Sequence, residues 1–118
     1  MPEENISTAE KELRVSERLA LEEKVIAALR TVYDPEVPVN IYELGLIYEL
    51  LVEPTANIRI TMTLTAPNCP EAAFIPVRVR DAVKAVPGVA DAQVELVFEP
   101  PWTPNRMTEA AKLQLGFF

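Results

Sequence analysis

The single cysteine of this chain, Cys69, carries the side chain that is best suited to nucleophilic or metal-binding chemistry. It stands in the sequence Ala66-Pro67-Asn68-Cys69-Pro70, between a predicted strand and a predicted helix. The free N–H groups and the dipole at a helix N-terminus favour a thiolate over a thiol, and a thiolate binds soft metal ions. A lone cysteine is also commonly a small buried hydrophobic residue. From these residues alone, a reactive or metal-binding thiol and an inert core residue are equally supported.

A second candidate for a functional site is the segment Asp34-Pro35-Glu36-Val37-Pro38. The carboxylates of Asp34 and Glu36 are of the type that binds hard or borderline metal ions or acts as a base. Aspartate followed by proline is equally typical of the start of a β-turn, and the spacing alone favours the turn.

Two further patterns have a chemical and a structural interpretation. Thr61, Thr63 and Thr65 alternate along a predicted strand, and we expect a solvated or half-covered strand face rather than a catalytic row. Trp102 stands among three prolines, where an exposed aromatic side chain would mark a partner surface. Of the two interpretations of Trp102, the sequence favours a hydrophobic lid that closes the core.

The composition argues against a self-contained enzyme. There is no histidine, which removes the commonest general base, the usual zinc ligand and the partner of a nucleophilic serine or cysteine. One cysteine cannot form an intrachain disulfide or a closed structural zinc site. Three glycines are too few for a glycine-rich phosphate loop.

The charge and hydropathy patterns exclude other classes. A formal net charge of −7 leaves no surplus of Lys and Arg for nucleic acid or for an anionic membrane. The N-terminus is acidic and has no apolar core of a secretory signal, and no apolar run approaches the roughly 20 residues that span a bilayer. We therefore expect a cytoplasmic protein with no nucleic-acid or membrane partner.

The hydrophobic periodicity predicts one α+β domain. We expect a flexible N-terminal lead-in over residues 1–15 and a single domain over residues 16–118. Helices are predicted over 17–32, from about Pro76 to 86, and over 106–115; strands are predicted over 46–52, 58–65 and 92–98. Either the second helix begins near Pro76 or an earlier helix is kinked there. The order α-β-β-α-β-α implies a two-layer sandwich with helices packed on a small sheet. The predicted inward-facing helix positions are Leu19, Leu21, Val25, Ile26, Leu29, Val32, Ile75, Val79, Ala82, Val83, Val86, Met107, Ala110, Ala111 and Leu115.

Three segments together resemble a known family. They are Asp34-Pro35-Glu36-Val37-Pro38-Val39-Asn40-Ile41-Tyr42-Glu43-Leu44-Gly45-Leu46-Ile47-Tyr48, Met62-Thr63-Leu64-Thr65-Ala66-Pro67-Asn68-Cys69-Pro70, and Pro100-Pro101-Trp102-Thr103-Pro104-Asn105-Arg106-Met107. In this order they resemble the SufT-like proteins of the iron–sulfur cluster assembly domain family, over roughly residues 20–118. The phosphate-binding domain of cluster-carrying ATPases and the cysteine-rich tail of oxygenase accessory proteins are missing, so the resemblance is to a stand-alone member.

The resemblance implies a role in maturing iron–sulfur proteins alongside SUF-type machinery. It implies that Cys69 is the reactive or ligating residue and that Asp34 lies near it, with Glu36, Thr65, Pro67 and Asn68 in support. Because a cluster needs about four ligands, usually cysteines, one chain would hold iron or a cluster only transiently, and a homodimer in which each chain offers Cys69 is one solution. The implied partners are iron–sulfur assembly proteins and apo-targets. The alternative is an adaptor that binds no metal and recruits apo-targets, with Cys69 serving only the fold.

Overall fold

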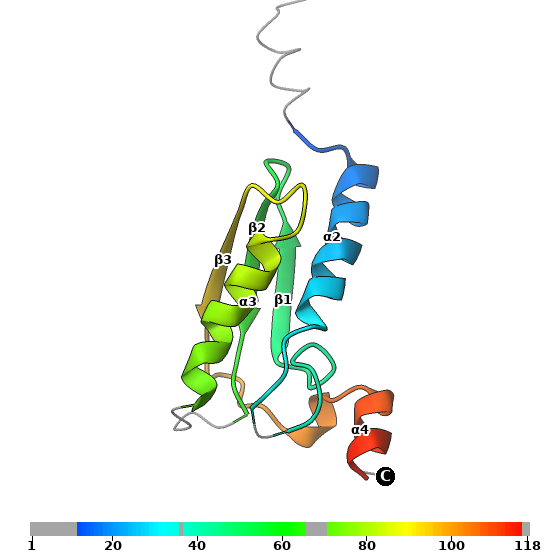
Figure 1. Cartoon of the computed structure of the whole chain (residues 1–118), viewed down its shortest axis with the longest axis vertical. Coiled ribbons are helices and arrows are strands. Elements are labelled where there is room, and N and C mark those ends of the chain that lie inside the picture. Colours follow the sequence, from blue (N-terminus) through cyan, green and yellow to red (C-terminus); the bar gives the residue numbers. More distant parts are fainter. Residues whose placement is uncertain (1–11, 36, 66–70, 117–118) are drawn as a thin grey trace, which may run out of the picture.

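The computed structural model describes residues 12–35, 37–65 and 71–116 (Figure 1). Within these residues the elements follow the predicted order α-β-β-α-β-α, which confirms the α+β class. The helices are α2 (Val15–Leu29), α3 (Ile75–Lys84) and α4 (Glu109–Leu115), and the strands are β1 (Ile47–Val52), β2 (Asn57–Met62) and β3 (Asp91–Leu96). Short 3-10 helices at Glu71–Phe74 and Pro104–Arg106 precede α3 and α4.

The three strands form one sheet in the order β1-β2-β3. β1 and β2 are an antiparallel hairpin, whereas β3 runs parallel to β2 after the crossover through α3. Ile58, Ile60 and Met62 of β2 are buried, while Arg59 is exposed and Thr61 is half-buried, so the period-2 pattern of the sequence is realised. The sequence did not determine this strand order.

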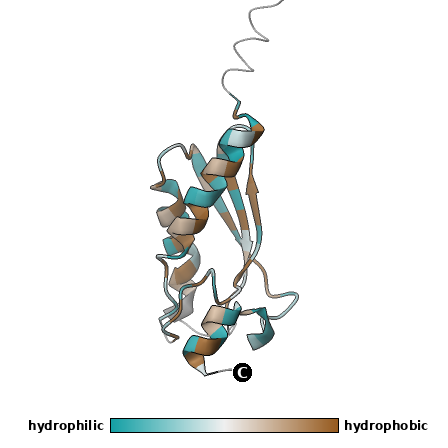
Figure 2. Ribbon diagram, turned by 90° about the vertical axis from the view of Figure 1, so that its right-hand side faces the viewer, coloured by the Kyte–Doolittle hydropathy of each residue, from teal (hydrophilic) through white to brown (hydrophobic). Residues whose placement is uncertain are grey.

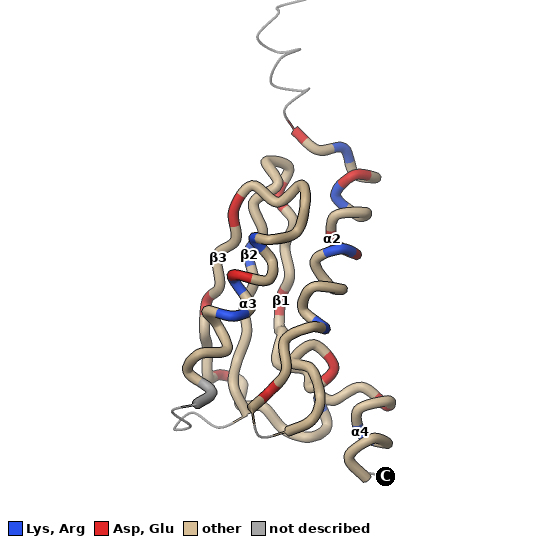
Figure 3. Tube along the Cα trace, viewed as in Figure 1, with Lys and Arg blue, Asp and Glu red and all other residues tan. Residues whose placement is uncertain are grey.

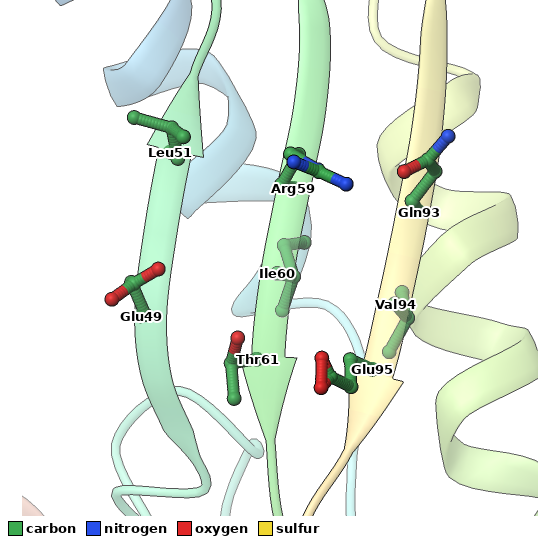
Figure 4. A pocket seen from close by; sticks show the side chains of 8 residues that line it. All are labelled: Glu49, Leu51, Arg59, Ile60, Thr61, Gln93, Val94 and Glu95. Atoms are coloured by element: carbon green, nitrogen blue, oxygen red, sulfur yellow. The ribbon is translucent and has the colours of Figure 1, made fainter.

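Helices α2 and α3 cover one face of the sheet, and no described helix covers the other face (Figures 1 and 4). Each of these two helices buries one stripe of apolar residues. Hydrophilic and hydrophobic bands alternate along α2 in Figure 2. The prediction that Leu19 faces inward is wrong: it is 58% exposed, because it lies about 200° around the helix from Leu21. The prediction is also wrong for Ala110, which is exposed. The buried helix positions are Leu21, Val25, Leu29, Ile75, Val79, Val83 and Ala111.

Several element ends differ from the predicted ones. α2 ends at Leu29, and Val32 is buried in the turn that follows. β2 ends at Met62 rather than at Thr65, and Thr63 is 1% exposed, so the prediction of a solvated threonine face is wrong for that residue. After the strand ends, the Thr63 N–H still donates to the carbonyl of Leu46, the residue just before β1. Pro76 lies in the first turn of α3, the first of the two predicted alternatives, because the missing N–H costs nothing there.

The described chain begins just before α2. The Leu13 N–H donates to the Pro54 carbonyl at 2.7 Å, and the Leu13 side chain packs against the core. Residues 1–11 of the predicted lead-in lie outside the described residues. None of the described helices is long and apolar enough to cross a membrane.

Candidate functional site

The described parts of the segments that carry the family resemblance meet at one end of the sheet, where β1 begins and where β2 and β3 end (Figure 1). The Thr63 N–H donates to the Leu46 carbonyl at 2.9 Å, which joins the end of β2 to the entry of β1. The Val97 N–H donates to the Met62 carbonyl at 2.8 Å, which joins the end of β3 to the end of β2. Residues that are far apart in the sequence are therefore positioned by one sheet.

Asp34 is buried at the start of the loop before β1, with 7% of its surface exposed. Its Oδ1 accepts a hydrogen bond from the Val37 N–H at 3.0 Å, and its own N–H donates to the Val39 carbonyl at 3.4 Å. These contacts are those of an aspartate that caps a turn, the interpretation that the spacing favoured. Glu36 lies outside the described residues.

Asn40 and Glu43 hold the second half of this loop in a one-turn helical conformation. The Asn40 Oδ1 accepts from the Glu43 N–H at 2.9 Å, and the Asn40 Nδ2 donates to Glu43 Oε2 at 3.0 Å. The Thr108 Oγ1 donates to Glu43 Oε1 at 3.3 Å, and the Thr108 N–H donates to the Glu43 carbonyl at 2.9 Å. The network ties the loop before β1 to the N-terminus of α4. We did not predict these residues as part of the site, although the Asn-x-x-Glu spacing is that of a helix-capping pair.

We expect Asn40→Ala to lower the free energy of unfolding by about 1–2 kcal/mol, because a buried cap is lost and the Glu43 N–H loses its acceptor. Urea unfolding followed by circular dichroism measures the effect. Asn105→Ala is the matched control, since Asn105 is exposed, and it should change stability by no more than about 0.5 kcal/mol. Equal effects of the two substitutions would contradict the assigned role of Asn40.

Residues 100–108, named here the C-terminal strap, close this end of the molecule. Trp102 is partly buried against the core and its Nε1 donates to the Leu44 carbonyl at 2.6 Å, which agrees with a lid over the core. The Tyr48 hydroxyl donates to the Pro100 carbonyl at 2.6 Å, and the Arg106 guanidinium lies 4.4 Å from the Tyr48 ring centroid. The strap therefore packs against the residues at the start of β1 and stabilises their position.

Cys69, Pro67 and Asn68 lie outside the described residues, so the predicted closeness of Cys69 and Asp34 stays a prediction. The described neighbours in sequence are Thr65, which is half-buried, and the 3-10 helix Glu71–Phe74. The α-helical N-terminus of α3 comes only at Ile75, so the helix turn nearest to Cys69 in sequence is of the 3-10 type rather than the predicted α type. Among the described residues, no three cysteine, aspartate or glutamate side chains gather closely enough to hold a metal ion.

The structure is a small α+β domain, and comparison with known proteins identifies its family. Residues 22–96 match the family model described as iron–sulfur cluster assembly protein. The chain belongs to this family, which confirms the resemblance found in the sequence.

The relatives include stand-alone proteins of similar length. The chain is 52% identical to a protein of Porphyromonas gingivalis named Fe-S protein maturation auxiliary factor, over 86% of this chain and 97% of that protein. It is 36% identical to the Fe-S protein maturation auxiliary factor SufT of Staphylococcus aureus, over 72% of this chain and 97% of that protein. The crystal structure of a domain of unknown function from Bacillus anthracis superposes with a TM-score of 0.80 and is 38% identical, over 89% of this chain and all of that one.

Proposed function

We propose that this protein is a non-catalytic accessory factor in the maturation of iron–sulfur proteins, and that Cys69 is the thiol through which it handles iron or a labile cluster. The observation that carries this proposal is that the described parts of the three segments with the sequence resemblance lie at the sheet end from which the chain enters the Cys69 segment at Thr65. The names of the maturation factors to which the chain is similar support the same role. Iron or a cluster is cargo in this proposal, not a resident cofactor.

One chain supplies too few thiolate ligands to hold a cluster by itself. A cluster takes about four ligands, and each chain supplies one thiolate. The remaining ligands come from a second copy of the chain, from small thiols or from carboxylates. A site completed in this way releases its cargo readily, which is what a carrier needs. Asp34 is assigned a supporting role, since its Oδ1 already accepts the Val37 N–H and holds the loop.

Anaerobic reconstitution with ferrous iron and sulfide tests the role of Cys69. Wild type, Cys69→Ala and Cys69→Ser are compared by absorption spectroscopy and by iron determination after desalting. We expect cluster absorption and bound iron in the wild type and the loss of both in the two variants, because neither alanine nor serine supplies a soft thiolate ligand. Far-UV circular dichroism checks that the variants stay folded.

Two other outcomes have distinct meanings. Equal iron in wild type and in both variants would show that Cys69 is not the ligand. No iron in any of the three proteins would favour the adaptor, a module that recruits apo-targets without binding metal.

A further inference from the structure

Helix α2 carries a second stripe of residues beside the one that is buried in the core. Val15, Leu19, Glu22 and Ile26 lie within about 60° of one another around the helix axis and are named here the outer stripe. Val15 is 68% exposed and Leu19 is 58% exposed. We propose that the outer stripe packs antiparallel against the same stripe of a second copy of this chain. This inference goes beyond the proposed function and does not depend on it.

The outer stripe forms one wall of a groove along the β1 edge of the sheet. The groove runs from Val15 and Leu51 to Ile26 and Tyr48, and Glu22 lines it along its length. Leu51 is 42% exposed, so the strand side of the groove is apolar as well as the helix side. In Figure 2, where α2 faces the viewer, no described element lies in front of this helix. Exposed apolar residues that gather in this way are typical of a protein contact site.

The spacing of the outer stripe is self-complementary. Its residues are separated by four, three and four positions, an order that is the same in both chain directions. When two such stripes run antiparallel about a two-fold axis, Val15 lies opposite Ile26 of the second copy. Leu19 then lies opposite Glu22 of the second copy, whose aliphatic carbons it can contact. Each stripe residue therefore has a counterpart across the axis, as a contact between identical surfaces requires.

The charged residues at the centre of the stripe also match across this axis. Arg18 precedes Leu19, so in the antiparallel register it lies within about 1.5 Å, measured along the helix axis, of the level of Glu22 of the second copy. The Arg18 Nε donates to the Val52 carbonyl at 3.2 Å, which holds the guanidinium in the groove. The other N–H groups of a guanidinium can donate to a carboxylate. The two-fold axis forms this Arg18–Glu22 pair twice.

The balance of charge favours a second copy over a partner of one sign. Acidic and basic residues both occur along α2 (Figure 3). Among the described residues that line the groove near the end of β1, the charged ones are Arg18 and Glu22. A strongly acidic partner would be repelled by Glu22, and a strongly basic partner would be repelled by Arg18. A second copy presents the opposite charge to each of them.

The size of the contact determines its expected strength. Stable protein interfaces bury about 1,200–2,000 Å² in total, and one stripe of a 15-residue helix with one strand edge lies at or below the lower limit. We therefore expect a reversible dimer with a dissociation constant on the order of 100 µM.

Antiparallel packing separates the two candidate functional sites. The first turns of α2 lie beside the end of β1, where Arg18 bonds to Val52, and Ile26 lies beside Ile47 at the start of β1. The chain enters the Cys69 segment at the sheet end where β1 begins, so the two Cys69 segments start at opposite ends of the dimer. This dimer is therefore distinct from one in which two chains share a cluster, and dimerisation and iron binding are measured separately.

Sedimentation equilibrium of the full, iron-free chain tests the apolar part of the contact. We expect a monomer–dimer equilibrium at concentrations up to about 1 mM. Leu19→Gln should weaken dimerisation by at least about tenfold, because the substitution acts twice in a symmetric contact. Leu113→Gln is the matched control, since Leu113 is 63% exposed on α4 and does not line the groove. Its dissociation constant should stay within about twofold of wild type.

Exchange of the charged residues tests the register. Glu22→Lys and Arg18→Glu should each weaken dimerisation by at least about tenfold, because each substitution places like charges at both Arg18–Glu22 contacts. An equimolar mixture of the two variants should dimerise within about threefold of wild type, since opposite charges then meet at both contacts. Glu23→Lys is the control for net charge, because Glu23 is exposed and does not line the groove. Less negative charge alone would strengthen self-association of this chain of net charge −7, which is the opposite of the effect expected for Glu22→Lys.

Any of three results would overturn the inference: a monomer up to about 1 mM, equal effects of the two leucine substitutions, or a mixture of the charge variants that stays monomeric. Far-UV circular dichroism confirms that each variant is folded. Cys69→Ala should dimerise as wild type does. Loss of iron binding with intact dimerisation would refute only the proposed function, and the reverse result would refute only this inference.

Discussion

Gly45→Ala is expected to lower the free energy of unfolding by about 3 kcal/mol or more, and the melting temperature by about 10 °C or more. Gly45 has a φ of +80°, a region that costs other residues energy, and a Cβ built at this position would lie 2.2 Å from the backbone carbonyl oxygen of Arg106. Because the clashing atom belongs to the Arg106 backbone, the clash cannot be relieved by a change of side-chain rotamer. Either the loop before β1 or the C-terminal strap has to move. Differential scanning calorimetry and urea unfolding measure the loss.

Gly116→Ala separates the conformational cost of a positive φ from the cost of the steric clash with the strap. Gly116 ends α4 with a φ of +82°, but no atom of the described residues lies within 4 Å of a Cβ built at this position. This substitution therefore carries only the conformational cost, about 1 kcal/mol. If Gly45→Ala is no worse than Gly116→Ala, the close approach of the strap to Gly45 is not a constraint on this fold.

The elements of this fold could be predicted because their signals are local. The alternation of Ile58, Ile60 and Met62 with polar residues specifies a strand with one buried face, and Pro87-Gly88 stops the preceding helix. The order of helices and strands followed from such signals. The order of the strands within the sheet did not, because it depends on which edge of β2 receives β3, and that is decided by packing between distant segments.

The errors had two causes, tertiary packing at the end of β2 and the helix geometry of α2. Thr63 continues the alternation of β2, yet the strand ends at Met62 and Thr63 is buried, with its N–H bonded to the Leu46 carbonyl. Leu19 is apolar and two residues from Leu21, but the helix turns it to the exposed side. Its neighbour Val15 is exposed as well, so α2 carries apolar residues outside the core stripe.

The candidate site was predictable only in part. Asp34 was singled out from its place before Pro35, and the structure gives it the contacts of a turn-capping residue. The contributions of Glu43 and of Arg106 were not foreseen, because their partners are Thr108 and the backbone near Gly45, more than 60 residues away in sequence. Long-range contacts of this kind leave no periodic signal. The role of Cys69 came from the motif around it and is still a prediction.

Trp102→Ala is expected to lower the free energy of unfolding by about 3 kcal/mol, because a large partly buried ring is removed and the Leu44 carbonyl loses its donor. Trp102→Phe keeps most of the apolar surface but no N–H group, so it should cost about half as much. Chemical unfolding of the two variants separates ring burial from the hydrogen bond. If phenylalanine restores wild-type stability, the bond to Leu44 contributes nothing.

The double variant Gly45→Ala/Trp102→Ala tests whether the strap acts as one unit. Trp102 bonds to the carbonyl of Leu44, and Gly45, the next residue, packs against the carbonyl of Arg106. Once the added methyl group has pushed the strap away, the indole has little contact left to lose. We therefore expect the double variant to be more stable than the sum of the single losses implies, by about 1 kcal/mol or more. Strict additivity would mean that the two contacts hold the strap independently, and that motion of one part of the strap would leave the other part in place.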